Sequence, residues 1–275
     1  MLRTRIISAI LLITAVAFFV WVGNPLFALL IGIVAALALN EFSKLLIKQG
    51  DRPLRIIGGG ATALLILHGL GLGEMFLPAA LALVVFGGLL SDLYNEKEDA
   101  YLRGWASTIA GVLYIGFPLS LAVAIRDFQN PDGLLWCILT ALGVWSCDTG
   151  AYFAGRFLGG KVLGTRRFSP RWSPNKTWEG FLGGCLLSLI AVFVFGVYVM
   201  PLYGTGLLWW QALLLGVLMG PVTAWGDLAE SMVKRRVGVK DSGDLIPGHG
   251  GMLDRIDSML FGIILVYFFA RWVVY

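Results

Sequence analysis

Two acidic clusters in the second half of the sequence have the residue types and the spacing of a cation site. Each places two carboxylates and a serine at positions i, i+3 and i+4: Asp227, Glu230 and Ser231 in one, and Asp254, Asp257 and Ser258 in the other. On a helix, each trio lies on one face. If two antiparallel helices brought both faces to one level, the carboxylates would repel each other unless a cation lay between them. Oxygen ligands favour a hard ion, so the pattern predicts Mg²⁺.

A further carboxylate, Asp148, lies inside an apolar segment, in Ser146-Cys-Asp-Thr-Gly-Ala-Tyr152. A charged side chain at the centre of a membrane helix costs about 2.5–3.5 kcal/mol, so such residues are rare and usually functional. We expect Asp148 and Asp257 to complete a metal site formed by Asp227 and Asp254, or to orient nearby basic groups. The alternative interpretation is that the clustered acidic residues are interfacial groups in contact with water.

The segment between the two acidic clusters is basic and rich in glycine. It contains Lys234-Arg-Arg236, Lys240-Asp-Ser-Gly-Asp244 and Ile246-Pro-Gly-His-Gly-Gly251. Glycine lets a backbone approach a ligand closely, and a helix N-terminus presents free N–H groups, so this segment suits a polyphosphate. We expect His249 to bind phosphate or to stabilise the loop. The alternative is an ordinary cytoplasmic loop, whose positive charge explains the basic residues but not the interleaved Asp and Gly.

A second connection, residues 156–177, has six basic residues and no acidic one. It leads into Ser173-Pro-Asn-Lys-Thr-Trp-Glu-Gly180, and the prolines at 170 and 174 exclude a helix there. A basic loop beside anionic lipid headgroups remains an alternative for its arginines, but it explains the Asn-Lys-Thr-Trp-Glu run less well. The substrate-binding residues expected in this connection are Ser173, Asn175 and Lys176.

The elements that carry these residues are membrane helices. The chain of 275 residues is 58% hydrophobic and only 14% charged, with a mean hydropathy of +0.81. A soluble domain has about a quarter charged residues and could not hide so much apolar surface. The three cysteines lie in apolar runs without a CxxC pair, so we expect neither a disulfide framework nor a zinc site.

Apolar runs predict an all-α, polytopic transmembrane helical bundle of about nine spans. The run after Met1-Leu-Arg-Thr-Arg has no small-residue cleavage site, so we expect it to be retained as the first helix. The first two runs suit a tight hairpin through Gly23-Asn24-Pro25. The predicted segments are 6–22, 25–40, 56–72, 76–94, 104–125, 133–155, 179–200, 207–229 and 255–273.

The distribution of basic residues predicts the orientation of these spans. With nine alternating spans, one set of connections holds 19 of the 21 Lys and Arg, and the other holds only Arg126 and Arg271. The positive-inside rule makes the basic set cytoplasmic, with the N-terminus inside and the C-terminus outside. We expect residues 1–100 to be N-terminal scaffold helices and 101–275 to be a catalytic transmembrane domain whose active site faces the cytoplasm.

The functional segments resemble a known family. From Ser231 the chain reads S-M-V-K-R-R-V-G-V-K-D-S-G-D-L-I-P-G-H-G-G-M-L-D-R-I-D-S, which resembles the signature of the phosphatidate cytidylyltransferase (CDP-diacylglycerol synthase) family. The blocks Gly226-Asp-Leu-Ala-Glu-Ser231, Ser173–Gly180 and Asp148-Thr-Gly-Ala-Tyr152 are also similar to that family. The resemblance covers about 146–258 at the level of motifs, and before that it depends on hydropathy and length.

This resemblance implies an activity and a set of partners. Members transfer CMP from CTP to phosphatidic acid, which gives CDP-diacylglycerol and pyrophosphate. By resemblance, Asp227 and Asp254 are metal ligands, Mg²⁺ is required, and a monovalent cation such as K⁺ binds nearby. It also implies a homodimer with a site open to cytoplasm and lipid. We expect a bacterial inner (plasma) membrane protein without a nucleic-acid partner.

The chemistry of this transfer agrees with the residues. The phosphate of phosphatidic acid is largely dianionic at neutral pH, because the second pKa of a phosphomonoester is about 6, so no general base is needed. The enzyme must neutralise charge and align two anionic substrates. We expect Lys176 to contact the lipid phosphate or CTP. The residues expected to neutralise pyrophosphate are Lys234, Arg235, Lys240 and Arg255, and the further expected substrate contacts are Ser231, Gly250 and Gly251.

Three other functions are weighed against this one. An ion-coupled transporter also clusters buried carboxylates, but here they lie near one membrane face beside a charge-rich loop that transport does not require. A CDP-alcohol phosphotransferase would need its D-G-x-x-A-R…G-x-x-x-D-x-x-x-D arrangement, which is absent. A non-enzymatic scaffold leaves the paired Asp faces unexplained.

Overall fold

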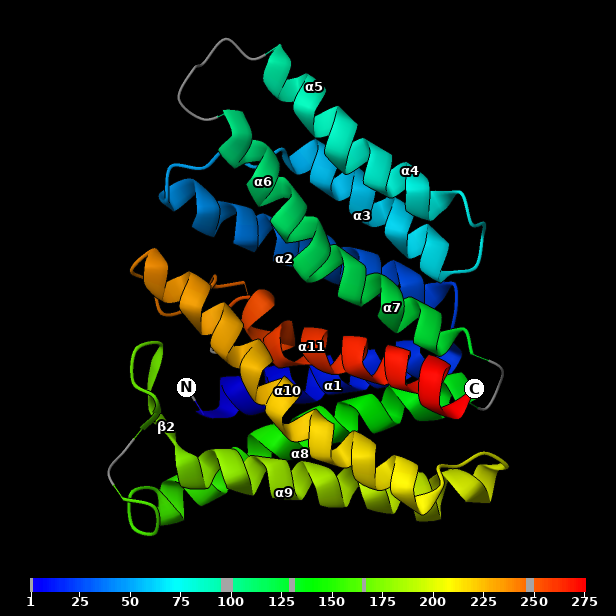
Figure 1. Ribbon diagram of the computed structural model, residues 1–275, viewed down its shortest axis with the longest axis vertical. Coiled ribbons are helices and arrows are strands. Elements are labelled where there is room, and N and C mark those ends of the chain that lie inside the picture. Colours follow the sequence, from blue (N-terminus) through cyan, green and yellow to red (C-terminus); the bar gives the residue numbers. More distant parts are fainter. Residues whose placement is uncertain (1, 95–100, 129–131, 165–166, 246–249) are drawn as a thin grey trace. The chain divides into compact units, whose positions relative to one another are not determined.

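The computed structural model describes residues 2–94, 101–128, 132–164, 167–245 and 250–275, and these are mostly helical (Figure 1). The N-terminal half contains α1 (Leu2–Val22), α2 (Leu26–Lys48), α3 (Arg55–Gly69), α4 (Phe76–Ala82), η1 (Leu83–Gly87), α5 (Gly88–Leu93), α6 (Tyr101–Gly111), η2 (Val112–Gly116) and α7 (Phe117–Arg126). The C-terminal half contains α8 (Asp132–Leu158), β1 (Arg167–Ser169), β2 (Ser173–Thr177), α9 (Trp178–Val194), η3 (Phe195–Val199), η4 (Met200–Tyr203), α10 (Trp209–Arg236), α11 (Leu253–Phe269) and η5 (Ala270–Val274).

Every predicted apolar segment falls on a helix. Among the described residues, six helices are long and apolar enough to cross a membrane: Leu26–Lys48, Leu102–Arg126, Asp132–Leu158, Trp178–Tyr203, Trp209–Arg236 and Leu253–Val274. Three shorter apolar helices occupy the other predicted positions: Leu11–Val22, Arg55–Gly69 and Phe76–Ser91. The chain is therefore an integral membrane protein. The count of nine spans and the inside position of the N-terminus stay predictions.

Two helices continue beyond their predicted apolar segments. The second helix, α2, runs on from residue 40 to Lys48, and α10 runs on from 229 to Arg236. A segment predicted from hydropathy ends at the first polar residues. Glu, Lys and Arg are good helix formers, however, so the helical hydrogen bonding continues beyond that point. These polar extensions carry Glu41 and Lys234, which both take part in the site described below.

The chain divides into two compact units, and the division differs from the expected boundary at residue 100. The first unit combines Met1–Asp127 with Val233–Ile256, and the second combines Phe128–Met232 with Asp257–Tyr275. The loop between α10 and α11 therefore belongs with the N-terminal helices. Residues expected to be scaffold and residues expected to be functional lie in the same unit.

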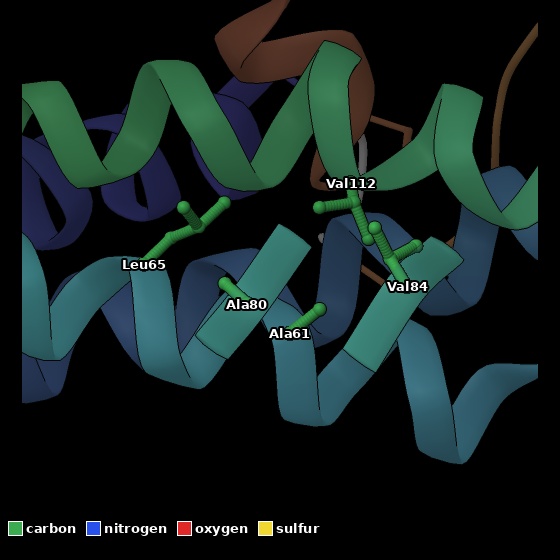
Figure 2. Packing of buried hydrophobic residues seen from close by; sticks show 5 residues of the cluster. All are labelled: Ala61, Leu65, Ala80, Val84 and Val112. Carbon is green, nitrogen blue, oxygen red and sulfur yellow. The ribbon is translucent and has the colours of Figure 1, made fainter. Parts of the chain in front are cut away.

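A small apolar cluster holds helices of the first unit together. Ala61 and Leu65 of α3 meet Ala80 of α4, Val84 of η1 and Val112 of η2 (Figure 2). The two alanines keep the side chains short where the helices meet, so Leu65 and the two valines fill the space between the backbones. This packing holds α3 against its neighbours through apolar side chains.

Close helix packing also defines the second unit, in which α8 and α9 lie side by side (Figure 1). Glycines line the contact: a Cβ atom on Gly184 would lie 2.8 Å from the carbonyl oxygen of Cys147. Ser188 Oγ donates a hydrogen bond of 2.8 Å to the Gly143 carbonyl across the same pair. Such small-residue contacts replace the hydrophobic driving force that lipid removes.

Candidate active site

A β-hairpin carries the first functional lysine. The sequence excluded a helix between 170 and 174 but did not predict that β1 and β2 pair antiparallel, with Arg167 opposite Thr177. Thr177 also caps α9, because its Oγ1 accepts a hydrogen bond of 3.1 Å from Gly180 N. Phe168 of β1 stacks on Phe181 of α9 with ring centroids 4.4 Å apart. The hairpin is thereby held against the start of α9, and its last strand presents Lys176.

Lys176 forms an ion pair with Asp227 of α10. The Nζ–Oδ2 distance is 2.7 Å, and the side chains are 26% and 36% exposed. Ser231 Oγ donates to the other oxygen of Asp227 over 3.3 Å. The prediction that Asp227 and Ser231 share a helix face is confirmed. Because this carboxylate is only partly covered, it is accessible to a ligand.

Helices α10 and α11 approach each other closely next to Asp227. A Cβ atom on Gly226 would lie 2.8 Å from the carbonyl oxygen of Asp257 and 3.0 Å from the Cα atom of Ser258. The backbone beside Asp227 therefore lies against that of Asp257 and Ser258 within the second unit. Glu230, on the same helix as Asp227, is fully buried.

A second lysine–aspartate pair lies in the first unit. Lys234 Nζ is 2.6 Å from Asp254 Oδ1, and these side chains are only 11% and 6% exposed. The other carboxylate oxygen of Asp254 accepts hydrogen bonds from Ser242 N over 2.9 Å, Ser242 Oγ over 3.0 Å and Gly251 N over 2.9 Å. Asp254 thus binds Ser242 and Gly251 through one carboxylate oxygen while the other binds Lys234.

The start of α11 corrects one expectation from the sequence. We expected its free N–H groups to face a phosphate, but Met252 N and Leu253 N each donate a hydrogen bond of 2.9 Å to the carboxylate of Glu41. An acidic side chain from α2 satisfies these donors, because anionic groups are favoured at a helix N-terminus. The N–H of Gly251 is likewise used by Asp254.

Sequence reasoning missed Glu41. It lies on the polar extension of α2, outside the segments that were singled out, and it is 5% exposed. A signal was present, because Glu41 is an acidic residue directly after the predicted apolar segment 25–40. The same criterion drew attention to Asp148.

The remaining predicted residues occupy less enclosed positions. Arg235, Lys240 and Arg255 are exposed, and Arg235 Nη1 donates to the Val239 carbonyl over 3.0 Å. On β2, Asn175 is exposed and Ser173 is half-buried, and Asp148 is exposed on the surface of α8. Gly250 adopts a φ of +81°, which favours glycine in that turn. His249 lies outside the described residues.

Glu179, at the start of α9, binds the segment that follows α8. Its Oε1 atom accepts hydrogen bonds from three backbone N–H groups just after α8. The donors are Gly160 at 3.0 Å, Val162 at 3.3 Å and Leu163 at 2.9 Å. The residue is 5% exposed at the start of α9. It therefore ties the end of α8 to the element that follows the hairpin.

The donor chemistry of the site suits Mg²⁺. Within the described ranges, no three His, Cys, Asp or Glu residues are grouped closely enough to hold a metal ion by themselves. Mg²⁺ does not need such a group, because it usually binds through one or two carboxylates, substrate phosphates and water. Asp227 has a half-open carboxylate, and both Asp227 and Asp254 already face a cationic ammonium group. The predicted metal ligands Asp227, Asp254, Asp257 and Asp148 stay a prediction.

Comparison with known proteins identifies the family of this chain. The model of the cytidylyltransferase family matches residues 3–273. The chain belongs to this family. Phosphatidate cytidylyltransferase of Brucella suis is 35% identical over 98% of this chain and 93% of its own length. The proteins of the same name from Bacillus subtilis and Thermotoga maritima are 32% and 34% identical, over 97% and 94% of this chain and 97% and 93% of their own lengths. The family thus extends over the N-terminal helices, where the sequence had only hydropathy to compare.

Proposed function

We propose that this chain is a phosphatidate cytidylyltransferase, which transfers CMP from CTP to phosphatidic acid and releases pyrophosphate. The observation that carries the proposal is its similarity, over nearly the whole of both chains, to relatives of that name. The two lysine–aspartate pairs support it, since a reaction between two anions needs basic groups held in fixed positions.

The reaction is an in-line displacement at phosphorus. A phosphate oxygen of phosphatidic acid forms a bond to the α-phosphorus of CTP, and the bond from that phosphorus to the α,β-bridging oxygen breaks. The electron pair leaves with pyrophosphate. Because the attacking phosphate is already largely dianionic at neutral pH, with a second pKa of about 6, no side chain has to remove a proton. The work of the protein is charge neutralisation and alignment.

We assign each residue a role in this work according to how exposed its side chain is. Lys176, which is partly open and held by Asp227, contacts the lipid phosphate or CTP. Lys234, held by Asp254, neutralises the leaving pyrophosphate together with the exposed Arg235, Lys240 and Arg255. Asp227 and Asp254 are the residues that would hold Mg²⁺, with Asp257 and Asp148 as further ligands. When bound, Mg²⁺ supplies positive charge to the CTP phosphates.

The setting of the site follows from its substrates. Phosphatidic acid is a membrane lipid, so it reaches the site sideways between helices, whereas CTP arrives from the cytoplasm. We therefore propose an active site at the cytoplasmic face of a bacterial inner membrane, as the excess of basic residues in one set of connections supports. A homodimer and a bound K⁺ ion are further proposals that come from the family resemblance.

The test is the reaction itself. Detergent-purified protein is incubated with phosphatidic acid, labelled CTP and Mg²⁺, with EDTA and ATP as controls. Labelled CDP-diacylglycerol that forms only with CTP and Mg²⁺ supports the activity, the donor and the metal together. No product from well-folded protein, across several lipids and with K⁺ present, would refute the proposal and favour an ion-coupled transporter.

A further inference from the structure

We propose that Glu41 of α2 is a positioning residue for the cytidylyl transfer, because it holds the loop and the helix start that carry Asp254. This inference rests on the proposed function. Glu41 forms no hydrogen bond that the structure shows to the lysines and arginines assigned to the substrates. It acts through Ser242, Met252 and Leu253, which lie more than two hundred residues along the chain, in the same unit.

Both carboxylate oxygens of Glu41 accept hydrogen bonds from the loop and the start of α11. Oε1 accepts a hydrogen bond from Met252 N, and Oε2 accepts from Leu253 N, each at 2.9 Å. Oε2 also lies 3.0 Å from Ser242 Oγ. A buried carboxylate is costly unless charged or hydrogen-bonding partners surround it, and the first N–H groups of α11 provide them. The same contacts fix the point at which α11 begins, one residue before Asp254.

Ser242 connects Glu41 to the Lys234–Asp254 pair. Its hydroxyl lies 3.0 Å from Glu41 Oε2 and 3.0 Å from Asp254 Oδ2, and the residue is only 7% exposed. A hydroxyl has a single hydrogen, so it donates to one carboxylate at a time and spans the two. The backbone N–H of Ser242 donates to Asp254 as well. Movement of Glu41 would therefore move the carboxylate that holds Lys234.

The loop is shaped to receive this carboxylate. A Cβ atom on Gly251 would collide with Glu41 Oε2 and with Ser242 Oγ, and one on Gly243 would lie 2.8 Å from Glu41 Oε1. The residues from Ser242 to Leu245 and part of α2, Glu41 included, line a cavity of about 260 Å³, so the loop and the helix are not closely packed there. The loop therefore depends on Glu41 for its position, and this separates a positioning role from a general contribution to the core.

The experiment uses the full chain in detergent and five variants, two of which are controls. Glu41→Gln keeps the size of the side chain but replaces one carboxylate oxygen with an NH₂ group, which cannot accept a hydrogen bond from a backbone N–H. Glu41→Asp keeps the charge but shortens the side chain. Glu74→Gln removes one carboxylate at an exposed position and serves as the matched control. Ser242→Ala removes the bridging hydroxyl, and Ser43→Ala removes a buried hydroxyl elsewhere on α2 as its control.

Two readouts distinguish positioning from mere stability. The first is kcat and KM for CTP, each corrected for the folded fraction. We expect Glu41→Gln and Ser242→Ala to lower kcat about 10–100-fold, with Glu41→Asp between Glu41→Gln and wild type, because supporting residues around a reactive group have effects of this size. The second is amide hydrogen exchange at Met252 and Leu253, which should become faster in Glu41→Gln and stay unchanged in Glu74→Gln.

The outcomes are separate from those of the activity assay. A wild-type kcat in folded Glu41→Gln, or a loss of kcat that only follows the loss of folded protein, would overturn the inference. If Glu41→Gln does not fold, Ser242→Ala decides, since wild-type kcat in that variant also overturns it. If the wild-type chain itself makes no product, the proposed function fails, and unchanged hydrogen exchange in Glu41→Gln would still reject the contact.

Discussion

Breaking the Lys234–Asp254 pair should separate stability from catalysis. The change Asp254→Asn removes the negative charge 2.6 Å from Lys234 Nζ and leaves an ammonium group that is 11% exposed beside a neutral amide. Loss of one partner from a buried ion pair costs about 3–5 kcal/mol, because the other charge stays desolvated. We expect the free energy of unfolding to fall by about 3 kcal/mol, at the low end of that range, since the asparagine oxygen can still accept a hydrogen bond. Turnover should fall at least about 100-fold, as expected for loss of a group that aligns the reactants.

The double variant Lys234→Met/Asp254→Asn provides the matched control. It has no unpaired charge at this position, so we expect it to recover part of the lost stability, as apolar replacements of buried pairs do. Its turnover should stay as low as that of Asp254→Asn or lower. Denaturation in detergent micelles measures the first effect, and formation of labelled CDP-diacylglycerol measures the second. A double variant as unstable as the single one would refute the charge argument, and wild-type turnover in folded Asp254→Asn would refute the catalytic assignment.

Three further outcomes are expected. Lys176→Met and Asp227→Asn should each lower turnover at least about 100-fold with little change in stability, because this pair is partly exposed; a large loss of stability would instead indicate a structural role. Gly251→Ala should lower both stability and turnover, since the added Cβ atom would collide with Ser242 and Glu41. Gly59→Ala on α3, where a Cβ atom meets open space, should behave as wild type in the same assays. EDTA should abolish product formation and added Mg²⁺ should restore it, and activity that survives chelation would exclude the proposed metal.

Local properties of the chain were predictable because they need only one segment at a time. Hydropathy placed every apolar helix, since burial in lipid depends on the composition of a single run. The i, i+4 spacing predicted that Ser231 would lie beside Asp227, because helix geometry alone decides it. The ends of α2 and α10 were predicted too early, because hydropathy stops at the first polar residues whereas helix hydrogen bonding does not.

The partners of the site residues depended on the tertiary structure. Lys176 and Lys234 were both predicted as phosphate-binding groups, but nothing in their local spacing says that Asp227 binds the first and Asp254 the second. Each pairing requires elements that are distant in sequence to pack together. The same is true of the hairpin, whose aromatic contact with α9 sets the position of Lys176.

By itself, the sequence determined that this is a helical membrane protein, which residues carry its charge, and which family motifs it contains. The tertiary structure alone decided how the N–H groups at the start of α11 are satisfied. A helix N-terminus attracts any anionic group, so the sequence could indicate a phosphate there. Instead, Glu41 accepts hydrogen bonds from those donors because α2 packs against the loop. Glu41 is 201 residues from Ser242 in the sequence, so no local pattern predicts this contact.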